Sequence, residues 1–296
     1  MKLIPKFPDF QILTLDFYRE IREVCLALDS GISEFSASCL CIHSPKYGYK
    51  ISRWEDSLII SYFSPYKKRN EFIFLGKFPC GEVISRLFET HTCWTHISEK
   101  DFLENEGKFI SWGLRTEEDR DSFDYLYFRE DLASLSGRKF HKKKNLVNAF
   151  LAAHSPYDRP LDETTVPHAL EILEKWNKTH HDNIPTDYEI CKFTLENLSR
   201  LELMGKVIYV DDVPVGWYLG EIFEQNKMFC CHFEKADSDY KGAFQYVNRL
   251  AAESLPDYVH LINREQDLGD EGLRQAKLTY RPCGFVKKIA AFKDSV

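Results

Sequence analysis

The chain has 296 residues, of which 44% are apolar and 29% are charged, and its formal net charge is −7 at pH 7. Its length admits one large domain or two ordinary ones, and its composition excludes a disordered chain. The acidic balance excludes a protein that is basic over its whole surface, although a local basic patch is compatible with it.

The first ten residues contain two lysines and two prolines, which a secretory leader would not tolerate. We therefore expect a cytoplasmic protein whose nine cysteines are reduced and mostly buried. Cys39 with Cys41 and Cys230 with Cys231 have no second pair at zinc spacing, so no metal site is predicted. The histidine cluster at residues 180–182 is interpreted as surface. No apolar run is long enough to cross a bilayer.

The first half of the sequence alternates helical and strand-like patterns. β-branched and aromatic runs separated by turn residues indicate a strand meander that follows an amphipathic helix. The expected elements are a helix at 14–28, strands at 49–54, 57–63 and 71–75, a helix at 81–90, a strand at 124–129 and a basic helix from Lys139.

Residues 153–167 contain three prolines and are interpreted as a linker between units 1–152 and 153–296. Two helices, a three-strand meander, a helix, a strand, a helix and a strand are expected after it. This is the element order of the GNAT acyltransferase fold, in which two adjacent strands splay apart and the acyl donor occupies the opening. We therefore predict an α/β (α+β) fold of tandem GNAT-like units, each a mixed, splayed sheet flanked by helices.

Five segments in this order resemble the phosphatidylglycerol lysyltransferase C-terminal domain family. They lie at 124–129, 137–145, 232–237, 263–269 and 272–277. The resemblance covers most of the chain and implies a tandem GNAT-like fold. The best-known members of that family move an aminoacyl group from tRNA to a lipid headgroup.

Six basic residues or histidines fall between residues 138 and 144, where a helix is expected. Such a cluster suits the phosphates of a tRNA acceptor end or of a nucleotide-bearing donor, and a solvated helix face is the alternative. The candidate binding residues here are Arg138, Lys139, Lys142 and Asn145.

Lys241 and Gly242 stand between a strand and a helix, where a glycine lets the backbone approach a phosphate. An ordinary helix cap is the alternative. GNAT proteins that use acetyl-CoA carry Gln or Arg three residues before this glycine and Gly or Ala two residues after it. Asp239 and Phe244 occupy those positions here, which favours an aminoacyl-tRNA donor over acyl-CoA.

Charged residues also follow the strands on either side of the expected opening. Glu234 could accept a proton from an attacking amine or hydroxyl. In the next strand end, Asn263 and Glu265 flank Arg264, which could clamp a carboxylate or phosphate, and Asp267 could hold an ammonium group. Salt bridges at strand ends are the alternative interpretation.

The segment Gly-Leu-Arg-Gln-Ala-Lys at 272–277 matches a family motif that supplies a lysine near the transferred acyl group. The resemblance therefore implies a catalytic role for Lys277, with Arg274 one helical turn earlier. A cation there could stabilise an oxyanion, whereas a lysine at a helix end often only offsets the helix dipole.

Together these patterns predict an acyltransferase that moves an aminoacyl group from tRNA to an amine or hydroxyl on a lipid headgroup, a peptide or a metabolite. The acyl donor is a co-substrate, and no cofactor is expected. A non-catalytic module that binds tRNA, a nucleotide or a charged metabolite is one alternative, and an acyl-CoA-dependent N-acetyltransferase is another. The transferase hypothesis requires the side chains of Lys277, Glu234 and Arg264 to lie close together.

Overall fold

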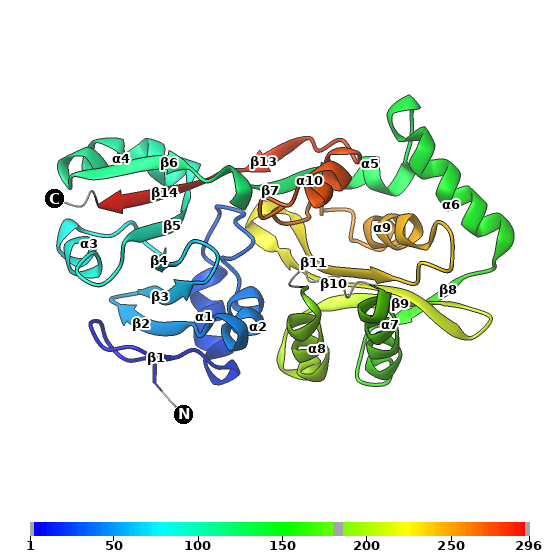
Figure 1. The fold of residues 1–296 in the computed structure, drawn as a ribbon, viewed down its shortest axis with the longest axis horizontal. Coiled ribbons are helices and arrows are strands. Elements are labelled where there is room, and N and C mark those ends of the chain that lie inside the picture. Colours follow the sequence, from blue (N-terminus) through cyan, green and yellow to red (C-terminus); the bar gives the residue numbers. More distant parts are fainter. Residues whose placement is uncertain (1–2, 180–185, 294–296) are drawn as a thin grey trace. The chain divides into compact units, whose positions relative to one another are not determined.

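The computed structural model describes residues 3–179 and 186–293, so the histidine cluster at 180–182 lies outside the described residues (Figure 1). The chain forms two compact units. Unit 1 comprises Met1–Asp124, Gln266–Arg274 and Phe285–Val296, and unit 2 comprises Tyr125–Glu265 and Gln275–Gly284. These units exchange segments, so they do not follow the single boundary after residue 152. The division into 1–152 and 153–296 stands as a proposal about where one GNAT-like repeat ends.

Unit 1 is built on a seven-stranded sheet whose neighbouring strands are antiparallel except for the parallel pair β4–β5. The strand order is β1 (Gln11–Ile12), β2 (Lys50–Trp54), β3 (Ser57–Ser64), β4 (Arg69–Leu75), β5 (Cys93–Ser98), β14 (Lys288–Lys293) and β6 (Leu114–Glu118). The accompanying helices are α1 (Tyr18–Cys25), α2 (Ala37–Tyr47), α3 (Gly81–Leu87) and α4 (Glu99–Ser111).

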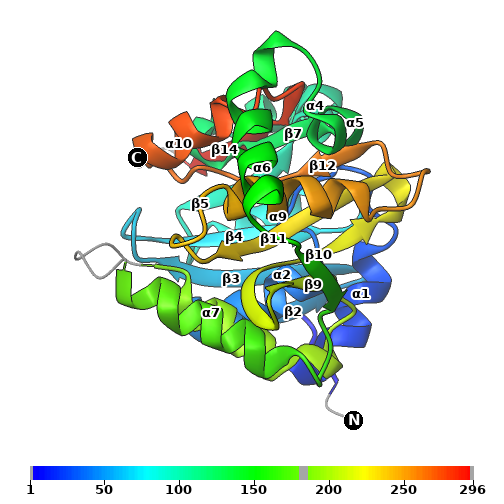
Figure 2. The same ribbon diagram turned by 90° about the vertical axis from the view of Figure 1, so that its right-hand side faces the viewer.

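The second seven-stranded sheet has the order β13 (Gly284–Val286), β7 (Asp124–Phe128), β12 (Leu261–Asn263), β11 (Met228–Ala236), β10 (Val213–Phe223), β9 (Met204–Val210) and β8 (Tyr157–Pro160). Its helices are α5 (Arg129–Ser134), α6 (His141–Ala153), α7 (Val166–Thr179), α8 (Tyr188–Glu196) and α9 (Ala243–Glu253), and α10 spans Glu271–Leu278. Figures 1 and 2 show α7 and α9 on opposite faces of β10 and β11, which they both contact. The apolar faces of these elements form a buried core.

Strands β11 and β12 run parallel but pair over only three residue pairs, the last of which joins Cys230 to Asn263. Strand β12 ends there, whereas β11 continues to Ala236 with β10 as its neighbour. Among the strands that the structure describes, none pairs with this edge of β11 after Cys230. This is the splay that the element order of the second half predicts.

Several elements differ from the sequence-based expectations. The proline-rich stretch at 153–167 was predicted to be a linker, but it contains β8, which pairs with β9 as an edge strand where proline is tolerated. The sequence predicts one last strand, but the structure has two, β13 and β14, which belong to different sheets. Helix α2 was not predicted because it is buried over most of its first six residues and so lacks an amphipathic period.

Candidate functional site

The residues Arg264 and Glu234 meet beyond the point where β11 and β12 separate. Arg264 follows β12 and its guanidinium donates a hydrogen bond to the carboxylate of Glu234 on β11. Asn248 on α9 donates to the other oxygen of the same carboxylate at 3.1 Å. Burial opposes the charge of Arg264, but the attraction of Glu234 outweighs it and raises the pKa of the guanidinium. Arg264 is therefore charged, and both side chains of the pair are mostly enclosed.

Two tyrosine rings and a lysine complete the surroundings of Arg264. Its guanidinium carbon lies 5.9 Å from the ring centroid of Tyr127 and 5.0 Å from that of Tyr280. Lys143 on α6 places its Nζ 4.2 Å from the Tyr280 centroid. Burial and then the charge of Arg264 lower the pKa of Lys143. The basic helix therefore contributes one cation to this cluster.

The other residues of the predicted basic cluster lie elsewhere. Lys139 pairs with Asp131 at 2.7 Å, and Arg138, Lys142 and Asn145 are exposed. The helix α6 buries Val147 and Phe150, which share a face with residue 143. Lys143 was not among the candidate residues, because the run of basic residues does not itself show which of them lies on the buried face.

Lys277 on α10 contacts the backbone of the turn that follows β12, at Arg264 and Glu265. Its ammonium donates to the backbone carbonyl of Arg264 at 2.6 Å and to that of Glu265 at 3.1 Å. The hydroxyl of Tyr127 donates to the carbonyl of Lys277 at 2.9 Å. Lys277, Arg264 and Glu234 thus lie close together within unit 2. The ammonium of Lys277 contacts backbone carbonyl oxygens of this turn.

His232 lies between two carboxylates on the neighbouring part of β11. Its Nδ1 is 2.7 Å from Glu265 Oε1, and its Nε2 is 2.9 Å from Glu221 Oε1. Burial disfavours the charged ring, but the hydrogen bonds and charges of Glu221 and Glu265 outweigh it and raise the pKa of His232 to about 10. The backbone N–H of Glu265 donates to the fully buried Asn263 side chain at 2.7 Å, so Asn263 shapes this turn.

Asp267 and Arg274 form a separate network in unit 1. Arg274 contacts both oxygens of Asp267, at 2.9 and 2.8 Å, and also contacts Asp121 at 2.8 Å. The side chain of Asp267 is fully buried and accepts a further bond from the backbone of Gly269. These contacts leave the Asp267 carboxylate satisfied within the protein.

The segment before α9 gives its glycine a packing role. Gly242 has φ +93, and a Cβ added there would lie 2.2 Å from the carbonyl oxygen of Leu146 on α6. Only glycine fits such an approach without a shift of backbone. Lys241 is exposed, and Asp239 pairs with Lys175 at 2.7 Å.

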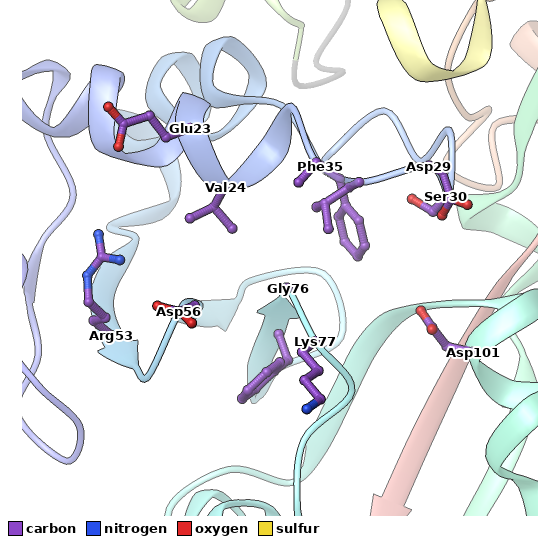
Figure 3. A pocket seen from close by; sticks show the side chains of 13 residues that line it. Glu23, Val24, Asp29, Ser30, Phe35, Arg53, Asp56, Gly76, Lys77 and Asp101 are labelled. Atoms are coloured by element: carbon purple, nitrogen blue, oxygen red, sulfur yellow. The ribbon is translucent and has the colours of Figure 1, made fainter.

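Unit 1 also contains a pocket with a volume of about 590 Å³. Figure 3 shows Val24 and Phe35 beside this space, with Asp56 and Lys77 across it. No candidate residue predicted from the sequence lines this pocket. The lining residues are Glu23, Val24, Ala27, Leu28, Asp29, Ser30, Phe35, Arg53, Asp56, Phe74, Gly76, Lys77 and Asp101.

The model of the family described as phosphatidylglycerol lysyltransferase, C-terminal, matches residues 27–292. The chain belongs to this family. The structure of a conserved protein of unknown function from Bacteroides thetaiotaomicron aligns with 98% of this chain and 99% of its own length, at a TM-score of 0.85 and 27% identity. The structure of L-PGS from Bacillus licheniformis aligns with 100% of this chain and 95% of its own, at a TM-score of 0.61 and 12% identity.

An uncharacterised protein of Mycoplasmoides gallisepticum is 25% identical over 175 residues, which are 56% of this chain and 55% of that protein. The chain thus spans about half the length of this curated relative. The family match confirms the resemblance seen in the sequence, and the likeness to L-PGS confirms the predicted tandem GNAT-like fold. Within the described ranges, none of the helices has both the length and the apolar character needed to cross a membrane.

Four residues around Arg264 and Glu234 were not predicted from the sequence, namely Tyr127, Lys143, Asn248 and Tyr280. Tyr127 lies in one of the segments that carry the family resemblance, and Lys143 lies in another. Asn248 carried a usable signal, because it is a polar residue on the buried face of the amphipathic helix α9. Tyr280 follows α10 with no pattern of its own.

Proposed function

We propose that this chain is an aminoacyltransferase that takes its acyl group from an aminoacyl-tRNA and passes it to an amine or a hydroxyl. The observation that carries the proposal is the ion pair of Arg264 and Glu234 beside the splay of β11 and β12. In GNAT-like folds this opening is where the acyl donor is expected. Membership in the phosphatidylglycerol lysyltransferase family supports an aminoacyl group as the cargo.

The roles of the two residues follow from their pairing. An incoming phosphate or carboxylate group would compete with Glu234 for the guanidinium of Arg264, since arginine binds such groups through two parallel hydrogen bonds. Glu234 would then be released beside the reacting groups and could act as a general base. Lys143, which lies over the same Tyr280 ring as Arg264, adds a second cation for the donor's phosphates.

The transfer itself is a direct displacement. The acceptor nitrogen or oxygen attacks the ester carbon, a new bond forms to the acyl group, and the ester bond to the tRNA ribose breaks. The acceptor's proton passes to Glu234 and from there to the departing ribose oxygen. Lys277 acts in this proposal as a positioning residue, because its ammonium holds the backbone carbonyls of Arg264 and Glu265.

The acyl-CoA alternative is less well supported by the same region. The backbone next to Gly242 is approached by the carbonyl of Leu146, which places an acceptor oxygen where a pyrophosphate would need donors. Asp239 adds a negative charge before this glycine. Both features favour a donor that is not anchored by a pyrophosphate at this helix start.

The test is transfer of a radiolabelled aminoacyl group from a mixture of aminoacyl-tRNAs to phosphatidylglycerol vesicles, peptides or free amines. Label should reach one acceptor class, and Glu234→Gln should reduce the rate by a factor of about 10² to 10⁴, the usual contribution of a general base. Glu171→Gln, the same change at an exposed position of α7, serves as the control.

Two outcomes would contradict the proposal. Salt-sensitive tRNA binding without transfer to any acceptor class would indicate a binding module. Thermal stabilisation by acetyl-CoA but not by tRNA would indicate an N-acetyltransferase instead.

A further inference from the structure

Three side chains with metal-binding atoms converge beside the splay. Cys230 and His232 are two residues apart on β11, and their side chains meet on one side of the strand. Glu265 comes from the turn after β12, the parallel neighbour of β11. The sulfur of Cys230 lies 3.9 Å from His232 Nδ1 and 4.0 Å from Glu265 Oε1, and the latter two atoms are 2.7 Å apart.

We propose that Cys230, His232 and Glu265 bind a divalent transition metal ion of the zinc type, with Glu221 as the outer partner of the histidine. Thiolate, imidazole and carboxylate are the ligands that zinc takes in proteins. Tetrahedral zinc with ordinary bond lengths holds such atoms about 3.4–3.6 Å apart. The sulfur therefore needs to move inward by a few tenths of an ångström, and the histidine and glutamate need to part by somewhat more.

The contact between His232 and Glu221 is the second argument. Histidines that bind a metal through one ring nitrogen commonly donate the other N–H to a carboxylate, which fixes the ring. Here Nδ1 faces Cys230 and Glu265, while Nε2 lies 2.9 Å from Glu221 Oε1. The ring is thus already held in the orientation that metal binding needs.

The charge of the group is the third argument. The two ring nitrogens of His232 face the carboxylates of Glu265 and Glu221. A divalent ion would bring two positive charges to a group that holds two carboxylates, so charges already present in the interior would balance the ion.

The proposed ligand group is partly exposed to solvent. The side chains of Glu265 and Glu221 are 21% and 17% exposed, whereas that of His232 is 1% exposed. Solvent therefore reaches the carboxylate side of the group. Three protein ligands leave a fourth position for water or for an oxygen of a bound molecule, as in zinc sites that are not purely structural. This inference does not depend on the proposed transfer reaction.

The experiment uses cobalt(II), a spectroscopic substitute for zinc, added to the full chain after chelator treatment under reducing conditions. We expect one ion per chain, a sulfur-to-cobalt charge-transfer band, and release of protons on binding in weakly buffered solution. Cys230→Ser should remove the band. Cys231→Ser is the matched control and should retain it, because that sulfur lies 3.7 Å from the carbonyl of Phe233 and belongs to the apolar core.

Two further variants keep the test decisive if Cys230→Ser folds poorly. Glu265→Gln should weaken cobalt binding and keep the band. Glu221→Gln should weaken cobalt binding by a factor of about 10 to 100, as loss of a partner to a metal-bound histidine does. The proposal is overturned if no band appears, if Cys230→Ser retains it, or if Cys231→Ser loses it.

Discussion

Arg264 and Glu234 stand thirty residues apart in sequence and form an ion pair where β11 has lost its neighbour β12. Their side chains are 18% and 13% exposed, so each neutralises a charge that has little contact with water. A pair of this kind is costly to break from one side, because the remaining charge has no compensation. It is also the part of the site that a charged substrate could open.

The first prediction concerns the stability of this pair. Arg264→Met should lower the free energy of unfolding by about 3–5 kcal/mol, since Glu234 is left enclosed without its partner. Arg249→Met is the control, because its partner Glu253 is one helical turn away on α9 at the surface, and its loss should cost less than about 1 kcal/mol. Urea unfolding measures both, and equal losses would contradict the assignment.

The second prediction concerns the turn that follows β12. Lys277→Met removes two hydrogen bonds to backbone carbonyls and should cost about 1–3 kcal/mol. The loosened turn should also speed amide hydrogen exchange at Arg264, whose N–H bonds to the carbonyl of Tyr125. Lys144→Met should change neither quantity. Unchanged exchange in the Lys277 variant would show that the ammonium does not hold this turn.

The third prediction concerns the protonation of Lys143. Burial and the charge of Arg264 lower the pKa of this ammonium, so its neutral form is present at a lower pH than in an exposed lysine. Labelling with an amine-reactive reagent should therefore show a pH midpoint below that of Lys144 on the same helix. Mass spectrometry of peptides across a pH series gives both midpoints. Coincident midpoints would contradict the placement of Lys143 beside Arg264.

The fourth prediction concerns the core of unit 1, where the ammonium of Lys288 is fully buried between Glu34 and Asp124. Lys288→Met should cost about 3–5 kcal/mol because two carboxylates are left facing each other. Lys287→Met is the matched control, since that lysine pairs with Glu99 and Glu118 at the surface and should cost less than about 1 kcal/mol.

The same variant should change the pH dependence of stability. In the wild type, burial works against the ionised form of Glu34, but His96 and then Lys288 lower its pKa below the ordinary value. Its contribution is therefore present above the unfolded pKa and is lost as the pH falls through the folded pKa. Burial already raises the pKa of Asp124, and Lys288 opposes that rise. Without Lys288, Glu34 keeps His96 but Asp124 loses its cation, so Asp124 should bind a proton and stability should instead fall as the pH rises through its folded pKa. Urea unfolding across a pH series distinguishes these slopes.

The splayed sheet could be predicted from the sequence because local patterns determine it. Runs of apolar and aromatic residues in β9, β10 and β11, together with the helix order around them, are sufficient for this part. The approach of Glu234 to Arg264 could be anticipated from the ends of strands, and that of Lys277 from the family motif. These features depend on short stretches of chain and on the family motifs.

Partner choice could not be predicted in the same way. Asp267 was expected to hold a substrate ammonium, yet its oxygens are bound by Arg274 and by the backbone of Gly269. The selection of Lys143 from a run of basic residues depends on which face of α6 is buried. The first case is decided by hydrogen bonds within the segment 267–274 and the second by the packing of one helix face, and the residue types alone determine neither.

The position of β14 has a consequence for how the protein is made. This strand comes from the last residues of the chain, yet it lies between β5 and β6 inside the sheet of unit 1. During synthesis β5 and β6 leave the ribosome long before β14, so their facing edges stay open until β14 emerges. The sheet of unit 1 can therefore be completed only after the segment 125–284 has been made, and removal of β14 should damage the sheet that begins the chain.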